Sequence, residues 1–219
     1  MNTSSTSANI PVAIFGGSGA TGKALISRLS RERVQVRTLA RKADSVSAGA
    51  GRVEVVAGSL SKLDDVLATL QGCGAAICVF GPRPPHVDVF CEQATSTIVT
   101  AVQQLGIRRL VCQTGGMIGD YRANRTLPFQ WMADAFLRHS PRIAGDRVGQ
   151  ESVVMHSGLD WTIVKPPRLT DGAAKGTWKA GPHVRLGMLS SISRDDLSAF
   201  LIEEILRPRH IGEVVFVRN

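Results

Sequence analysis

The stretch AIFGGSGATGKAL, Ala13–Leu25, carries three glycines at intervals of three residues. It follows a short apolar run, and apolar residues at helical spacing come after it. Between a strand and a helix, such a repeat is typical of a turn that binds the pyrophosphate of a dinucleotide. We expect Gly16 to permit the tight turn, Gly19 to let the backbone approach the pyrophosphate, and Gly22 to let the helix pack against the strand.

The residues between these glycines support the same interpretation. Ser18, Ala20 and Thr21 would lie at a helix N-terminus, where amide groups without helical partners and the helix dipole favour phosphate. The two hydroxyl side chains among them add donors. A Walker-type phosphate loop is excluded, because Ala24 stands where that loop needs Ser or Thr after Gly-Lys. A glycine-rich turn that binds no ligand remains the alternative.

The end of the second predicted strand indicates which dinucleotide would bind. NAD-binding proteins usually carry Asp or Glu there, which accepts hydrogen bonds from the ribose hydroxyls. This chain has Arg41 and Lys42, and its first acidic residue after the strand is Asp44. A guanidinium binds a 2′-phosphate with two hydrogen bonds, whereas a carboxylate repels it. The sequence therefore predicts NADPH, unless these two basic residues are only solvated loop charges.

Strand-like and helix-like segments alternate along most of the chain. This pattern predicts an α/β fold, a single doubly wound parallel-sheet Rossmann domain over residues 10–219 with a small C-terminal substrate-side lobe. Residues 1–9 are expected to be a disordered lead-in. Residues 168–190 are expected to form loops beside the sheet. The predicted strands are Val12–Phe15, Val34–Leu39, Val53–Val56, Ala75–Phe80, Arg109–Gln113, Trp161–Val164 and Glu213–Val217.

Helix caps are predicted at two serines. Ser61, with Asp64 three residues later, matches the N-cap and N3 positions of a helix. Ser193 is the predicted cap of a final helix, Arg194–Leu206, whose first turn is acidic and suits the helix dipole. Between these, Asp146–His156 is predicted to be helical.

Composition narrows the function classes. The chain has 219 residues, of which 43% are hydrophobic, and no apolar run near the ~20 residues of a membrane helix. It has no secretory signal at its start, so we expect a cytoplasmic protein. The net charge is +8, but the arginines are scattered, so we do not expect nucleic-acid binding. The four cysteines form no metal-binding spacing, and we expect reduced, buried thiols and no metal.

A second motif carries a family resemblance. The stretch SGLDWTIVKPPRL at 157–169, together with the glycine turn, resembles the atypical short-chain dehydrogenase/reductases of the NmrA-like, NAD(P)H-binding type. Within that family the chain is most similar to the biliverdin-IXβ reductases/flavin reductases. The stretch SISRDDLSAFLIEEIL resembles the helix that closes these domains. The resemblance runs from about Ile10 to the C-terminus.

The resemblance implies residues for the adenosine half of the cofactor. The glycine turn would hold the pyrophosphate, and Arg41 would bind the 2′-phosphate. Ser59–Leu60 would border the adenine, although the family often has Asp in place of Ser59. Phe80–Gly81 would pass under the ribose and phosphates, with Arg83 at a phosphate.

The nicotinamide half has its own implied residues. Thr114–Gly115 would lie near the ring, and Pro166–Pro167 and Arg168 would flank it from the other side. Arg168 and Thr114 are the candidate catalytic residues. The family pattern of biliverdin reductase has histidine in place of Arg168 and serine in place of Gly115, so the substrate site carries over less well than the cofactor site.

The usual proton donor of extended short-chain dehydrogenases is a Tyr-x-x-x-Lys pair. Here Tyr121 is followed four residues later by Arg125, which stays charged and cannot relay a proton as lysine does. Met117, Phe129 and the pair Trp131–Met132 would form either an apolar pocket wall or ordinary core.

These observations predict an oxidoreductase that uses NADPH to reduce a small-molecule conjugated substrate of the flavin, quinone or bilin type. Such an acceptor needs no strong protein acid. The protein would be a monomer or homodimer. The alternatives are a non-catalytic NmrA-like NAD(P) redox sensor and a carbonyl reductase or epimerase-type short-chain dehydrogenase.

Overall fold

A central sheet organises the computed structural model, which describes residues 10–42, 44, 46, 52–82 and 89–219. Its eight strands have the order β3-β2-β1-β4-β5-β6-β10-β8. Neighbouring strands run parallel except β8, which pairs antiparallel with β10. The strands are β1 Val12–Phe15, β2 Val36–Ala40, β3 Val53–Ala57, β4 Ala75–Cys78, β5 Arg109–Gln113, β6 Asp160–Lys165, β8 Lys179–Gly181 and β10 Glu213–Arg218. The predicted doubly wound α/β fold is confirmed; the predicted lead-in 1–9 lies outside the described residues.

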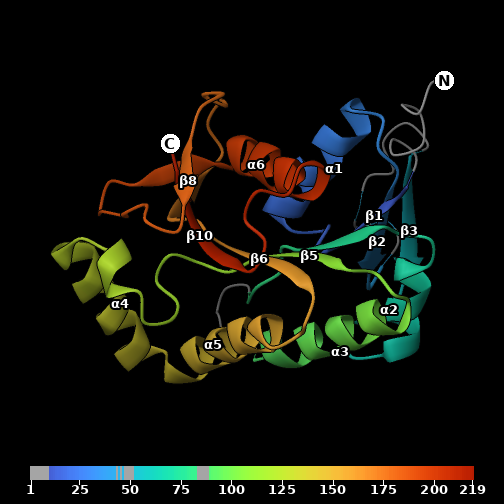
Figure 1. Cartoon of the computed structure of the whole chain (residues 1–219), viewed down its shortest axis with the longest axis horizontal. Coiled ribbons are helices and arrows are strands. Elements are labelled where there is room, and N and C mark those ends of the chain that lie inside the picture. The colour runs from blue at the N-terminus through green and yellow to red at the C-terminus, as the bar shows by residue number, and fades with distance from the viewer. Residues whose placement is uncertain (1–9, 43, 45, 47–51, 83–88) are drawn as a thin grey trace.

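Helices cover both faces of the sheet (Figure 1). The helices α1 and α6 pack on one face, and α2, α3 and α5 pack on the other. Accordingly, every residue of β1 and β4 is buried, as parallel strands covered on both faces require. The helices are α1 Ala20–Arg31, α2 Leu63–Leu70, α3 Cys91–Gln104, α4 Leu127–His139, α5 Pro141–Met155 and α6 Arg194–Leu206.

The segment 168–190 was predicted to be loop, and this prediction is wrong in part. Arg168–Thr170 forms β7, which pairs in parallel with β9, Ser191–Ser193. Lys179–Gly181 forms β8 at the edge of the main sheet. Three-residue strands are too short to show the alternation that identifies a strand in a sequence, and only pairing with distant segments creates them.

One of the two predicted caps is also wrong. Helix α2 begins one residue later than predicted, with Lys62 as its N-cap and no side-chain cap. The Ser61 hydroxyl pairs instead with that of Ser59, 2.8 Å away, and Asp65 accepts a hydrogen bond from the Ser59 amide at 2.8 Å. Ser193 does cap α6, because its hydroxyl accepts from the Asp196 amide at 3.0 Å. Helix α5 begins earlier than predicted, at Pro141.

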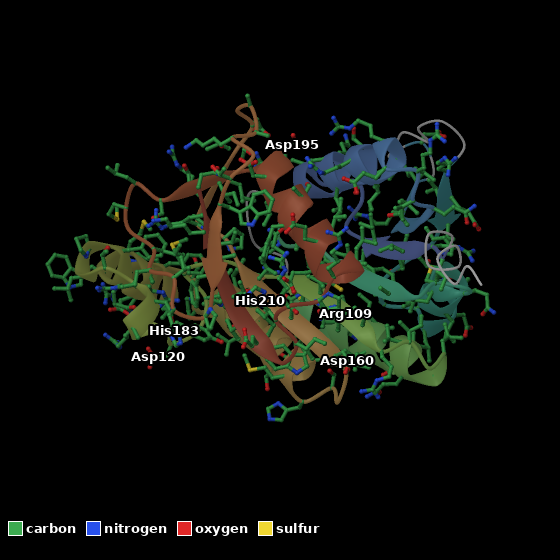
Figure 2. All side chains as sticks on the ribbon, turned by 45° about the horizontal axis from the view of Figure 1, so that its top comes forward. Arg109, Asp120, Asp160, His183, Asp195 and His210 are labelled. Carbon is green, nitrogen blue, oxygen red and sulfur yellow. The ribbon has the colours of Figure 1, made fainter. Side chains whose placement is uncertain are left out.

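A buried polar cluster joins α6 to the amino ends of β5 and β6. Arg109 donates to the carbonyl oxygens of Glu204 and Asp160 at 3.0 and 2.7 Å. The Glu204 carboxylate in turn lies 2.7 Å from Nδ1 of His210. Figure 2 shows Arg109, Asp160 and His210 close together beneath α6. These contacts fix α6 over the sheet from one end.

The predictions that were drawn from composition can be compared with the described residues. Cys73, Cys78, Cys91 and Cys112 are all buried free thiols, as predicted. Within the described ranges, no helix combines the length and apolarity needed to cross a membrane. Those ranges also hold no group of three or more His, Cys, Asp or Glu side chains placed to share a metal ion.

Candidate dinucleotide-binding site

A cavity of about 850 Å³ lies at the carboxyl ends of the central strands. The strand order reverses between β1 and β4, and open parallel sheets bind ligands at such a switch point. The cavity meets the segments that follow β1, β2, β3 and β4. Its lining residues are Gly16, Ser18, Gly19, Ala20, Thr21, Leu39, Ala40, Arg41, Gly58, Ser59, Leu60, Ser61, Val79, Phe80, Gly81, Pro82, Val89, Phe90, Gln93, Ala94 and Arg194.

The three glycines of the turn have different physical roles. Gly16 has φ +100°, and a Cβ there would come 2.8 Å from the amide nitrogen of Phe80. A Cβ on Gly22 would collide with the carbonyl oxygen of Gly16, so this glycine lets α1 approach β1. At Gly19 the nearest atom to an added Cβ is the Gly16 carbonyl oxygen at 3.3 Å. Gly19 thus lies open to the cavity, while the other two are closed in by protein.

Helix α1 begins directly at this turn. Its N-cap is Gly19, which offers no side-chain acceptor to the amides of the first helical turn. Those amides have no partner within the helix, so they and the helix dipole favour an anion. Ser18, Ala20 and Thr21 line the cavity beside them.

The cavity wall beyond β2 is basic. Arg41 follows β2, is exposed and lines the cavity. Lys42 is exposed next to it but is not among the lining residues. Among the described lining residues there is no Asp or Glu. The electrostatics therefore suit a ligand with negative charge at this end.

Two further predicted segments also line the cavity. Ser59–Leu60 follows β3 and is held by Asp65 of α2, and Phe80–Gly81 follows β4. Arg147 of α5 donates to the carbonyl oxygens of Phe80 and Gln113 at 2.9 and 3.3 Å, so it ties the end of β4 to the end of β5. Arg83, also predicted at the cofactor, lies outside the described residues.

The residues predicted at the nicotinamide come together at the ends of β5 and β6. The Thr114 amide donates to the Val164 carbonyl at 2.9 Å, and the Gly116 amide donates to the Pro166 carbonyl at 2.8 Å. Thr114–Gly115 and Pro166–Pro167 are therefore neighbours, although none of them lines the cavity described above. Arg168 is exposed at the start of β7.

A buried ionic cluster lies directly behind these strand ends. Lys165, fully buried on β6, forms an ion pair with Glu151 of α5. The hydroxyl of Thr114 donates to the same carboxylate at 2.6 Å, and the hydroxyl of Tyr121 donates to it at 3.2 Å. Lys165 also lies over the Tyr121 ring, 4.5 Å from its centre.

Burial dominates the acid–base properties of this cluster. It lowers the pKa of Lys165 from 10.5 to about 8, although the neighbouring Glu151 carboxylate opposes that shift. Burial, and secondarily Glu151, raises the pKa of the Tyr121 phenol well above its usual range. The phenol is thus a weaker acid than a free tyrosine.

Sequence reasoning did not identify Lys165 or Glu151. The signal was present in DWTIVKPP, where a lysine closes an apolar strand and needs a buried counter-charge. The position of that counter-charge, on a helix 14 residues earlier, depends on how α5 packs against β6.

The Tyr121 and Arg125 side chains do not form a catalytic pair. Arg125 is 2% exposed and donates to the carbonyl oxygens of Gly116, Ile118 and Gly119 at 2.8–3.0 Å. It is committed to holding the loop after β5.

The apolar residues predicted to form either a pocket wall or ordinary core are divided between two environments. Phe129 packs in a small core with Leu186 and Phe216, and Met117 and Met132 lie against it. Trp131 is 68% exposed. Core packing is therefore the role of Phe129.

A comparison with known protein families covers most of the chain. Residues 16–208 match the model of a family described as NAD(P)H-binding. The chain belongs to this NAD(P)H-binding family. The match starts at the glycine turn and includes every segment that lines the cavity, which confirms the resemblance predicted from the two motifs.

Solved structures of other proteins share the fold described above. The anaerobillin reductase ChuY from Escherichia coli O157:H7 has a TM-score of 0.78 at 23% identity, over 94% of this chain and 96% of that one. A short-chain dehydrogenase/reductase from Veillonella parvula, solved in complex with NADP, has a TM-score of 0.78 at 16% identity, over 95% and 94%. The oxidoreductase ylbE from Lactococcus lactis has a TM-score of 0.75 at 21% identity, over 95% and 90%. At these identities the likeness establishes the shared α/β fold alone.

Proposed function

We propose that this protein is an NADPH-dependent reductase that transfers hydride to a planar, conjugated acceptor of the flavin, quinone or bilin type. The observation that carries the proposal is the cavity at the β1/β4 switch point. It combines an open glycine turn with Arg41, and no carboxylate is among its described lining residues. Bound NADPH would supply the hydride. We expect the enzyme to be cytoplasmic and to be a monomer or homodimer. Each chain would consist of a single domain spanning residues 10–219.

The adenosine half of NADPH fits the walls of this cavity. Gly19 leaves room for the pyrophosphate beside the first turn of α1, where Ser18 and Thr21 add hydroxyl groups. Arg41, with Lys42 next to it, would bind the 2′-phosphate. Ser59–Leu60 would border the adenine.

The remaining residues would hold the other half of the cofactor. Phe80–Gly81 would lie under the ribose and phosphates. Backbone hydrogen bonds from Thr114 to Val164 and from Gly116 to Pro166 hold Thr114–Gly115 beside Pro166–Pro167, and we place the nicotinamide against these two segments. Arg168 remains the candidate that stabilises negative charge on the acceptor.

The chemical class of the acceptor can be inferred from the side chains that could donate a proton to it. A simple ketone becomes a localised alkoxide, and a positioned general acid contributes about 10²–10⁴-fold to such a reaction. Here the Tyr121 hydroxyl is bound to Glu151, and Arg125 is bound to backbone carbonyls. A conjugated acceptor spreads the incoming charge over its π-system and can take its proton from water. The protein then needs only to align two flat rings. One of the structures of similar fold is the anaerobillin reductase ChuY, and a bilin is a conjugated acceptor of this kind.

One observation favours a second candidate, a carbonyl reductase. Lys165 lies against Tyr121, which brings a lysine and a tyrosine together as in the usual acid pair. However, the ammonium group contacts the ring face, and the phenol donates to the Glu151 carboxylate. Burial, and secondarily this carboxylate, raises the pKa of the phenol. This arrangement makes a poor proton donor, so we rank the carbonyl reductase second.

The test is to follow oxidation of NADPH against a panel of flavins, quinones, bilins and simple ketones. We expect turnover with conjugated acceptors and poor turnover with ketones. Turnover confined to ketones would support the carbonyl reductase instead. Cofactor binding without turnover on any acceptor would support a non-catalytic redox sensor.

A further inference from the structure

A second arginine lines the cavity, and sequence reasoning gave it no role beyond opening the last helix. Arg194 is the first residue of α6, yet it lines the same cavity as the glycine turn. Arg41 and Arg194 are the basic residues among the described lining residues, and no acidic residue accompanies them. The cavity therefore has positive charge from two distant parts of the chain.

The hydrogen bonds of Arg194 are incomplete. One terminal nitrogen donates to the Asp171 carboxylate at 2.6 Å, which holds the guanidinium from one side. The Nε atom is buried and has no hydrogen-bond partner within the part of the chain that the structure describes. Because a buried atom is closed to the cavity, a ligand would be met by the other terminal nitrogen, which has no hydrogen bond to any described residue.

The start of α6 is fixed against α1. The residue after Arg194, Asp195, forms ion pairs with Arg28 and Arg31 of α1 at 3.5 and 3.6 Å. Figure 2 shows Asp195 at the start of α6, beside α1. Both arginines of α1 lie in its last turn, at the opposite end from the glycine turn, so these contacts fix how α6 packs against α1 and with it the place of Arg194 at the cavity.

We propose that Arg194 is a pyrophosphate-binding residue of this site, which rests on the proposed use of a dinucleotide. Asp171 positions the guanidinium, and the other terminal nitrogen donates to a phosphate oxygen. The pyrophosphate is common to NADPH and NADH. Arg194 therefore contributes equally to the binding of both, whereas Arg41 distinguishes between them.

The test compares Arg194→Gln with Arg41→Gln, and with Arg207→Gln as a matched control. Arg207 is exposed just after the other end of α6, so its substitution removes the same charge at a distance from the cavity. The dissociation constants of NADPH, NADH and adenosine 2′-monophosphate are measured by calorimetric titration. The last ligand has the 2′-phosphate and no pyrophosphate.

We expect Arg194→Gln to weaken NADPH and NADH by the same factor, about 10–100-fold, the range for one charge-assisted hydrogen bond. Binding of adenosine 2′-monophosphate should stay as in the control. Arg194→Lys should fall between wild type and Arg194→Gln, and thermal unfolding verifies that each variant is folded.

Two results would overturn the assignment alone. The first is an Arg194→Gln variant that binds both dinucleotides as tightly as the Arg207→Gln control. The second is a loss confined to NADPH and adenosine 2′-monophosphate, which would make Arg194 a 2′-phosphate ligand. If the wild-type protein binds neither dinucleotide, the proposed function itself fails, and the assignment fails with it.

Discussion

Lys165 and Tyr121 are 44 positions apart in the sequence and share one carboxylate, that of Glu151. The lysine pairs with it from β6, and the tyrosine donates to it from the loop after β5. Both side chains are thereby committed to the interior of the protein. This sharing gives Tyr121 a structural partner and makes its role in the reaction testable.

We predict that Tyr121→Phe leaves reduction of quinones or flavins nearly unchanged. The phenol has a raised pKa and donates to Glu151, so it is poorly suited to protonate a substrate. Steady-state turnover with NADPH measures the effect, with cofactor affinity as the control. A fall of about 10²–10⁴-fold in turnover, at unchanged cofactor affinity, would assign the phenol as a general acid and favour the carbonyl reductase.

Removing only the carboxylate should destabilise the protein strongly. Glu151→Ala leaves Lys165 buried without a counter-charge, and breaking a buried pair in this way costs about 3–5 kcal/mol. The double variant Lys165→Met with Glu151→Gln removes both charges, so we expect a much smaller loss. Urea unfolding of the three proteins gives the comparison. A single variant as stable as the double variant would contradict the charge argument.

The free energy of unfolding should depend on pH through Lys165. Its pKa is lowered from 10.5 to about 8 in the folded protein, so the unfolded chain binds more protons between these values. The free energy of unfolding that Lys165 contributes therefore rises with pH between about 8 and 10.5. It is lost as the pH falls back through this range to the folded pKa of about 8.

The same double variant isolates this effect. Cys73 and Cys91 have pKa values raised to about 11, which lowers stability over a similar pH range in both proteins. The difference between wild type and double variant cancels that contribution. We expect the free energy of unfolding of the wild type to increase relative to that of the double variant as the pH rises from 8 to 10.5. A difference that stays flat would mean that Lys165 keeps an ordinary pKa.

Two glycines of the turn should separate folding from cofactor binding. Gly19→Val places its side chain in the open cavity, so we expect a folded protein that no longer binds NADPH. Gly22→Ala would collide with the Gly16 carbonyl oxygen, so we expect a lower melting temperature. Thermal unfolding and fluorescence titration measure the two properties. Normal NADPH binding by a folded Gly19→Val protein would show that the cofactor lies elsewhere.

Arg41 should set the preference for NADPH over NADH. Arg41→Ala removes a charged hydrogen bond to the 2′-phosphate, which costs about 1.5–3 kcal/mol in NADPH binding. Binding of NADH should stay nearly constant, since NADH has no 2′-phosphate. Equal affinity of the wild-type protein for both cofactors would contradict this prediction.

The sequence by itself determined the fold class and the cofactor family. The glycine turn, the apolar runs of β1 and β4 and the alternation of strands and helices are local signals, because each depends on neighbouring residues. The segments at Ser59–Leu60 and Phe80–Gly81 could be named in advance through the family resemblance. The structure places both segments at the cavity.

Only the tertiary structure decided which distant side chains meet. The pairing of Lys165 with Glu151, the placement of Arg194 at the cavity and the short strand β8 all depend on how α5, α6 and β10 pack. A buried charge must find a partner, but the partner's position along the chain is set by packing and leaves no local periodicity. For this reason the cofactor turn could be read from the sequence, while the ionic cluster and the second arginine of the cavity could not.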